Sequence, residues 1–327
     1  MKRTWGGAVL VLGLLVLSCG VDANAQTTDD LVFIHHSCGS NWLSNSLNAA
    51  LVAKTYIDER NDITYGTDVA PDSGRPDSLA SDPGDSTNMN HWVKWFNDYL
   101  GGVKSHGCAD GVNKIIMFKS CYPISNMGGD GTEPGDPFVP TPSPTSTQTI
   151  TNYKAVYRHP SGAGNTYSTG GYNYYALEDI FAANPDTLFI PVTAPPLCNT
   201  STTNANAYRA RAFNEWLKNE WQASYNAANP GLNNVAVFDW FDVLASDNDA
   251  AYYPNRLKEV YGGGTTDSHP NSTGNADSTV VFATGTDNFI DGAYDAFTAE
   301  PVPEPATMTL VGLGLGAVAL VHRRRKT

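Results

Sequence analysis

Five short apolar runs, rich in β-branched residues, recur along the middle of the chain. They are LVFIH (31–35), DITYG (62–66), KIIMFK (114–119), TLFIPVT (187–193) and VAVFDW (235–240). Their hydrophobicity is continuous rather than alternating, which is typical of strands buried on both faces of a parallel sheet. The pattern therefore predicts a five-stranded, mostly parallel sheet.

Stretches with a helical period separate these runs, at 41–54, 90–103, 172–183 and 204–225, and a last one, broken near Gly285, covers 276–297. In 204–225 the apolar positions near a 3.6-residue period predict a core-facing side; they are Tyr208, Phe213, Trp216, Leu217 and Trp221. Strand and helix alternate, so we expect a three-layer α/β/α fold with a doubly wound sheet, in one domain over 26–300.

Two stretches interrupt this alternation, at 66–90 and 128–149. Both are rich in turn-forming residues, and we expect surface insertions at the carboxyl edge of the sheet, where loops shape binding sites. The first is rich in aspartate but lacks the ligand spacing of an EF-hand, so we expect a solvated loop rather than a Ca²⁺ site.

The first 25 residues have the layout of a signal peptide. Lys2 and Arg3 precede the apolar run AVLVLGLLVL, and the small-residue exit ANA stands before Gln26. A cut before Cys19, in VLSC, is the alternative, because that segment loosely resembles a lipoprotein signal. Either cut predicts an exported protein.

The C-terminal segment, 301–327, combines Pro-Glu-Pro (303–305), an apolar run (308–321) and a basic cluster (323–326). This order resembles the PEP-CTERM sorting tail of Gram-negative bacteria. The resemblance implies recognition by an exosortase, cleavage near 303–305, transient membrane anchoring, and delivery to the cell surface or an extracellular polysaccharide matrix. The apolar run is short for a full span of about 17 to 25 residues; a plain C-terminal membrane anchor is the alternative.

The chain is acidic, with a formal net charge of −13 at pH 7. Removal of both predicted ends would take away more basic than acidic residues, so the mature part is more acidic still. Such a surface repels phosphate backbones, which argues against a nucleic-acid partner. Few lysines and many Asn, Thr, Ser, Gly and Tyr residues suit a secreted protein that works among sugars.

Four cysteines lie outside the signal peptide: Cys38, Cys108, Cys121 and Cys198. In an oxidising compartment this even number predicts two disulfides, and three pairings are open. We favour Cys38 with Cys121, because both would lie just past the ends of neighbouring strands.

A serine follows the first predicted strand directly, in HHSCG. Ser37 would lie at the carboxyl edge of the sheet, close to the start of a helix whose backbone N–H groups can stabilise an oxyanion. Far downstream, in TTDSHPNSTGN, His269 precedes the last helix with Asp267 two residues before it. His269 could take the serine proton and return it to the leaving group, while Asp267 orients the imidazole ring.

Together these segments resemble the SGNH (GDSL-like) hydrolase superfamily, whose nucleophilic serine follows strand one and whose Asp-x-x-His block closes the domain. Ser37 matches the serine, His269 matches the base, and PVTAPPL (191–197) is similar to the segment of strand four. The resemblance implies a flavodoxin-like fold and an esterase that needs no cofactor and forms an acyl-enzyme on Ser37. With the sorting tail, it suggests deacylation of a carbohydrate or similar small ester.

The chain departs from the family at several positions. His35 and His36 replace Gly-Asp before the serine, and Thr266 fills the acid position, so both a triad with Asp267 and a Ser–His dyad are open. The oxyanion and pocket residues are expected among the following: His36, Gly39, Gly66, Ser120, Cys121 and Asn126.

Two other functions compete with the esterase. A metal hydrolase would use His35, His36 and His269, with Asp267 and His91, but adjacent histidines at a strand end point to opposite faces, so we expect no metal. A non-catalytic protein on the same scaffold would bind surface polysaccharide through exposed aromatic side chains. The candidates are Trp42, Trp92, Trp95, Tyr122, Tyr172, Tyr174 and Tyr175.

Overall fold

Four parallel strands form the central sheet of the molecule. The computed structural model describes residues 29–64, 69–72, 79, 88–89, 91–139 and 145–299. The strands are β1 (Asp29–His35), β2 (Ile57–Thr64), β3 (Asn113–Lys119) and β6 (Leu188–Val192), in the order β2-β1-β3-β6. The first strand lies inside the sheet and the chain leaves it in both directions, as in a doubly wound fold.

The fifth predicted strand, 235–240, is not confirmed as a strand. It lies beside β6 and makes two isolated parallel bridges, Phe189 with Val235 and Val192 with Phe238. The backbone bonds on either side of Pro191 are present, because Ala236 N–H donates to Phe189 O and Thr193 N–H donates to Phe238 O. Pro191 has no N–H to continue the ladder between them, which interrupts the regular pairing.

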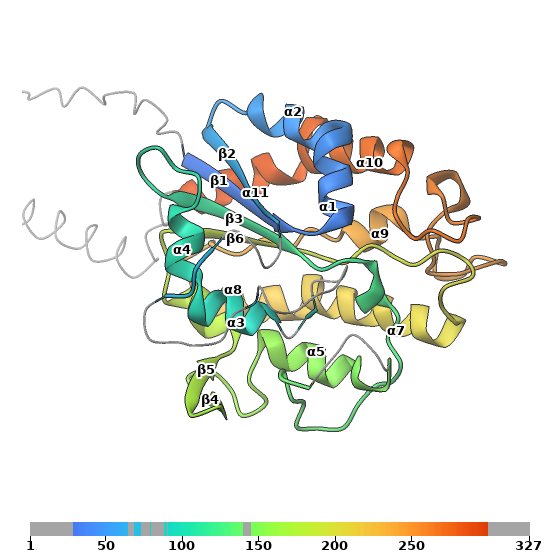
Figure 1. Cartoon of the computed structure of the whole chain (residues 1–327), viewed down its shortest axis with the longest axis horizontal. Helices are drawn as coiled ribbons and strands as arrows, with labels where there is room; N and C mark the ends of the chain where they lie inside the picture. The colour runs from blue at the N-terminus through green and yellow to red at the C-terminus, as the bar shows by residue number, and fades with distance from the viewer. Residues whose placement is uncertain are drawn as a thin grey trace, which may run out of the picture.

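Helices cover both faces of the sheet, as Figure 1 shows. One face carries α1 (Ser37–Trp42), η1 (Leu43–Leu47), α2 (Asn48–Val52), α9 (Trp240–Leu244), α10 (Ser272–Thr279), η7 (Val280–Thr284) and α11 (Phe289–Thr298). The other carries α3 (His91–Asp98), α4 (Leu100–Ser105), α5 (Ile150–Tyr157), α6 (Leu177–Ala182), α7 (Asn204–Glu215), η5 (Trp216–Trp221) and α8 (Gln222–Ala228). The molecule is therefore an α/β fold of three layers. Among the described residues no helix combines the length and the apolar character needed to cross a membrane.

Short elements complete the chain: η3 (Tyr122–Ser125), η4 (Thr145–Thr147), η6 (Glu259–Tyr261), and a hairpin of β4 (Thr166–Thr169) and β5 (Tyr172–Tyr175). The hairpin corrects the predicted helix over 172–183, which starts only at Leu177. Gly170 and Gly171 both have positive φ, at 58° and 82°, so they favour a tight two-residue turn in place of a helix start.

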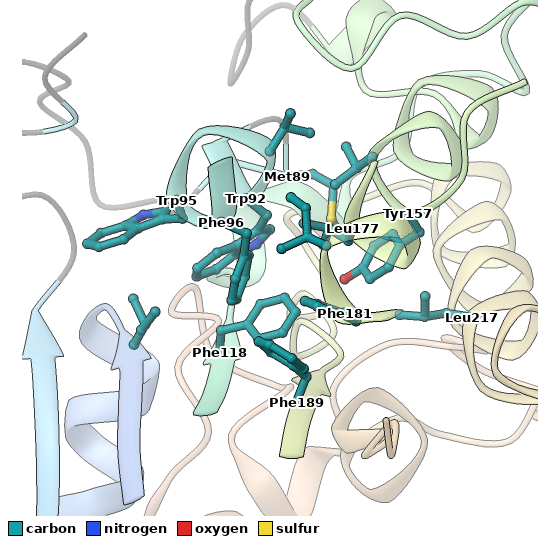
Figure 2. Packing of buried hydrophobic residues seen from close by; sticks show 14 of the residues in the cluster. Met89, Trp92, Trp95, Phe96, Phe118, Tyr157, Leu177, Phe181, Phe189 and Leu217 are labelled. Atoms are coloured by element: carbon teal, nitrogen blue, oxygen red, sulfur yellow. The ribbon is translucent and has the colours of Figure 1, made fainter. Parts of the chain in front are cut away.

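Alternate residues of the strands supply two separate cores. In β1, Val32 and Ile34 contribute to one core, and Leu31 and Phe33 to the other. The first core is rich in aromatic rings (Figure 2), including the stacked pair Phe181 and Phe189 with centroids 4.1 Å apart. Burial of β1, β3 and β6 on both faces explains why their runs read as continuously apolar, whereas the edge strand β2 is only partly buried.

The second core is built around Trp42, which is fully buried. Its ring stacks on Trp240 with centroids 4.6 Å apart, and Nε1 donates to Thr279 Oγ1 over 2.9 Å. These contacts join the helix that follows β1 to α9 and α10. They fix the helix that begins at Ser37 against the C-terminal third of the chain.

Apart from the start of the helix predicted over 172–183, the helical predictions are confirmed in outline, and the predicted core position of Tyr208 is corrected. Tyr208 of α7 was expected in the core, but it is 42% exposed and donates its hydroxyl to Asn248 O. The final helical segment breaks at Gly285, as predicted, and Asn288 caps α11 by accepting from Asp291 N–H. Asp72 belongs to the first predicted insertion, 66–90. Its carboxylate accepts from the N–H groups of Gly101 and Gly102, so it caps α4.

Candidate active site

Ser37 is the first residue of α1, two residues beyond the end of β1. The strand turns into the helix with only His36 between them, which requires a close approach of the two elements. Gly39 allows this approach, because a Cβ at that position would collide with the Cβ of His35. The serine hydroxyl therefore emerges at the carboxyl edge of the sheet, where doubly wound folds bind ligands.

His269 lies in the loop that leads into α10, and several bonds fix this loop. Ser268 Oγ accepts from the N–H of Cys198 over 3.0 Å. Asn271 donates its side-chain amide to Val260 O and accepts from Gly274 N–H, which caps α10. Gly263 packs so tightly on the backbone of Leu257 that a Cβ would collide with it. These anchors hold the imidazole in place.

The structure brings the three predicted catalytic side chains into one chain of hydrogen bonds. Ser37 Oγ lies 2.9 Å from His269 Nε2, and His269 Nδ1 lies 2.6 Å from Asp267 Oδ1. The backbone N–H of His269 also donates to Asp267 Oδ1 over 3.0 Å. The short spacing of the acid and the histidine is thus compatible with contact, and the geometry is that of a triad rather than a dyad.

The ionisation of Asp267 fits this arrangement. Partial burial opposes the charged carboxylate, but the two hydrogen bonds from His269 outweigh it and lower the pKa of Asp267. Asp267 is 64% exposed and His269 24% exposed, so the acid faces solvent while the imidazole is mostly covered. Tyr122 supports the imidazole edge-on, with ring centroids 4.9 Å apart. Sequence reasoning gave Tyr122 no role beside the histidine.

Two thiols lie beside the serine. Cys121 Sγ is 3.3 Å from Ser37 Oγ, and Cys38 Sγ is 3.2 Å from Cys121 Sγ. The prediction that Cys38 and Cys121 lie side by side is therefore confirmed. All four cysteines, including Cys108 and Cys198, are free thiols, so the two predicted disulfides are not confirmed. Hydrogen bonding from Cys38 and the charge of Lys119 lower the pKa of Cys121, while burial raises that of Cys38.

The other predicted oxyanion residues lie elsewhere. Ser120 is buried and its Oγ accepts from Trp92 Nε1 over 2.8 Å, because alternate side chains past β3 point to opposite faces. Asn126 Oδ1 accepts from Thr202 and Asn206 at the start of α7. The N–H of Gly39 is bonded to His36 O. Gly66 lies outside the described residues.

The two adjacent histidines diverge, as predicted. His35 is buried, with Nδ1 3.3 Å from Ser40 Oγ and Nε2 3.5 Å from Asp62, whereas His36 interacts with the thiol of Cys121. A cavity of about 400 Å³ adjoins His35, Ser40 and Asp62. His35 and His269 therefore serve different places, so the three histidines do not form one metal site.

Asp62 offers a test of the contact with His35. Its close contact with His35, together with Arg60, lowers the pKa of Asp62 to about 2. Because the folded pKa lies below the unfolded value of about 3.9, the stabilisation is complete above that value and is lost as pH falls through 2. We expect Asp62→Asn to lower the free energy of unfolding at pH 7 by less than about 1 kcal/mol, since the pair is partly exposed.

Urea unfolding of wild type and Asp62→Asn at several pH values from 7 to 3 measures this difference. The difference in free energy of unfolding between the two proteins should become smaller as the pH approaches 3. Asp130→Asn, which removes the carboxylate paired with Arg209 on the surface, is the control. A gap that widens as pH falls would contradict the assignment.

Most of the predicted sugar-binding aromatic side chains are buried. Trp42, Trp92, Trp95 and Tyr174 are each at most 1% exposed, because they fill the two cores. Tyr175 is 45% exposed and lies on the hairpin. The prediction that these four side chains are exposed for sugar binding is therefore wrong.

The comparison with protein families matches one segment. Residues 301–326 match the PEP-CTERM protein-sorting motif. This identifies the predicted sorting tail, which implies recognition by an exosortase, export and sorting to the surface in Gram-negative bacteria. No curated protein matches the chain. The tail and the predicted signal peptide lie outside the described residues.

Proposed function

We propose that the protein is an exported serine hydrolase that cleaves carboxylic esters through an acyl-enzyme on Ser37. The observation that carries this proposal is the continuous chain from Ser37 Oγ to His269 Nε2 and from His269 Nδ1 to Asp267, with contacts of 2.9 and 2.6 Å. The first contact lies within the range in which a base can take a proton from a nucleophile, and the second lies within the range in which a carboxylate orients that base.

The first half of the reaction forms the acyl-enzyme. Ser37 Oγ attacks the ester carbonyl carbon while its proton passes to His269 Nε2, and Asp267 stabilises the resulting imidazolium. The tetrahedral intermediate then collapses, and His269 gives the proton to the leaving alcohol. In the second half, water attacks the acyl carbonyl carbon while its proton passes to His269. The bond to Ser37 Oγ then breaks, His269 returns the proton to that oxygen, and the acid is released.

Backbone N–H groups at the start of α1 are the proposed oxyanion donors. The N–H groups of Gly39 and Ser40 are occupied by His36 O, whereas those of Ser37 and Cys38 precede the first helical bond. Because the side chains of Ser120 and Asn126 have other partners, the proposal assigns the oxyanion to these two backbone groups. The helix dipole favours negative charge at the same place.

The proposed substrates are small acyl esters on carbohydrate. The sorting tail supports this choice, because the resemblance of its motif implies delivery to the cell surface or an extracellular polysaccharide matrix. The excess of acidic side chains, which repels phosphate, argues against phosphate-bearing substrates. A purely polysaccharide-binding role is less favoured, because four of its seven candidate aromatic side chains are buried.

Labelling with a fluorophosphonate probe tests the proposal directly. We expect stoichiometric modification of the purified protein, with the modified peptide containing Ser37, and no modification of Ser37→Ala. Ser40→Ala and Ser120→Ala serve as matched controls and should label like wild type, because neither hydroxyl contacts His269. Modification that persists in Ser37→Ala, or that maps to Ser40, would refute the assignment of the nucleophile.

A further inference from the structure

Three ligand atoms of the type that zinc prefers converge beside Ser37. They are Cys38 Sγ, Cys121 Sγ and His269 Nε2, and all three lie within 4.8 Å of one another. They come from α1, from the residue after β3, and from the loop before α10. Two thiolates and one imidazole form one of the ligand sets that hold Zn²⁺ in proteins while leaving a fourth position open.

The contacts in this cluster are slightly shorter than the separations around a tetrahedral ion. With Zn–S of about 2.3 Å and Zn–N of about 2.0 Å, tetrahedral ligand atoms lie roughly 3.3 to 3.8 Å apart. The two sulfurs are 3.2 Å apart, and Ser37 Oγ lies 3.3 Å from Cys121 Sγ and 2.9 Å from His269 Nε2. Small side-chain rotations would admit an ion, with Ser37 Oγ or a water as the fourth ligand.

Asp267 prepares the histidine for this role as well as for catalysis. It holds His269 Nδ1 at 2.6 Å, which leaves the lone pair of Nε2 directed at Ser37 and the thiols. Histidines that bind metals usually have their other ring nitrogen bonded to such a carboxylate. The two sulfurs are fully buried, so an ion reaches them from the side of Ser37 and His269, which are partly exposed.

We propose that the reduced protein binds one Zn²⁺ through Cys38, Cys121 and His269, and that this ion blocks the reaction of Ser37. The inhibition rests on the proposed function, because the ion would occupy the nitrogen that must accept the serine proton. The binding itself does not rest on it. Zinc is thus a reversible inhibitor of the reduced protein at this site.

Zinc counting separates the two parts. The full-length protein, reduced with a phosphine and dialysed against ZnCl₂, should retain about one Zn²⁺ per chain by elemental analysis. Loss of even an outer partner weakens metal binding about 10- to 100-fold, so Cys38→Ser, Cys121→Ser and His269→Gln should each weaken it more than tenfold. Ser37→Ala should still bind, although it cannot hydrolyse esters, because water can take the fourth position.

Cys108→Ser is the matched control. Cys108 is a free cysteine too, and it belongs to a second possible cluster with Asp30 and Glu59. Zinc lost in Cys108→Ser but kept in Cys121→Ser would overturn the proposal, as would a wild-type protein without zinc. His269→Gln changes a half-buried loop residue, so it tests the site even where a buried cysteine variant fails to fold.

The inhibition is tested separately. In an active protein, saturating zinc should lower the rate of p-nitrophenyl acetate hydrolysis more than tenfold, and EDTA should restore it. Bound zinc without inhibition would refute the blocking role.

Discussion

His269→Gln is expected to reduce kcat for p-nitrophenyl acetate hydrolysis by about 10⁵- to 10⁶-fold. Glutamine cannot accept the proton of Ser37. Among the described residues, His269 Nε2, 2.9 Å away, is the only imidazole nitrogen within hydrogen-bond distance of Ser37 Oγ. Asp267→Asn should cost about 10⁴-fold, because an amide cannot stabilise the imidazolium and favours the wrong tautomer. Steady-state kinetics measures both, and KM should change little.

The size of the Asp267 effect is informative on its own. The carboxylate is 64% exposed, so water can partly replace it, and a loss well below 10⁴-fold would place the proposed enzyme nearer to a Ser–His dyad. His159→Gln is the control, because His159 packs on Tyr167 at the far side of the sheet. Equal activity of His269→Gln and His159→Gln would contradict the proposed mechanism.

Trp42→Ala is expected to lower the free energy of unfolding by about 3 to 5 kcal/mol. The substitution removes a fully buried indole that stacks on Trp240 at 4.6 Å, and it leaves the hydroxyl of Thr279 without the donor Nε1. Guanidinium unfolding followed by circular dichroism measures the change.

Val52→Ala is the matched control for this experiment. Val52 ends the same continuous helical segment but is 64% exposed, so its truncation should change the free energy of unfolding by less than about 0.5 kcal/mol. A Trp42→Ala protein as stable as Val52→Ala would mean that the second core does not depend on the stacked indoles.

The sheet could be predicted because its signal is local. The centres of two of the predicted runs, 31–34 and 115–118, are apolar at every position, a pattern typical of a strand covered on both faces. The irregular pairing of the last run, 235–240, could not be predicted in the same way. It depends on which residues of that run lie opposite Pro191 of β6, and this register follows from the fold rather than from the run itself.

In the candidate site too, local patterns predict some residues and not others. Ser37 follows a strand and His269 precedes a capped helix, so their places at the sheet edge could be predicted from local patterns. The role of Ser120 could not, because a shift of one residue along a strand exchanges its two faces, and the sequence does not show which residue faces the serine. In the structure Cys121 lies beside Ser37, whereas Ser120 accepts a hydrogen bond from Trp92.

The late position of the base has a consequence for secretion. The proposed nucleophile, Ser37, lies directly after the first strand of the folded domain, whereas His269 follows 232 positions later. A chain that crosses the membrane with its N-terminus leading would expose Ser37 early, without a proton acceptor. The proposed enzyme is therefore inert throughout translocation, and hydrolysis starts only when nearly the whole polypeptide has emerged and folded outside.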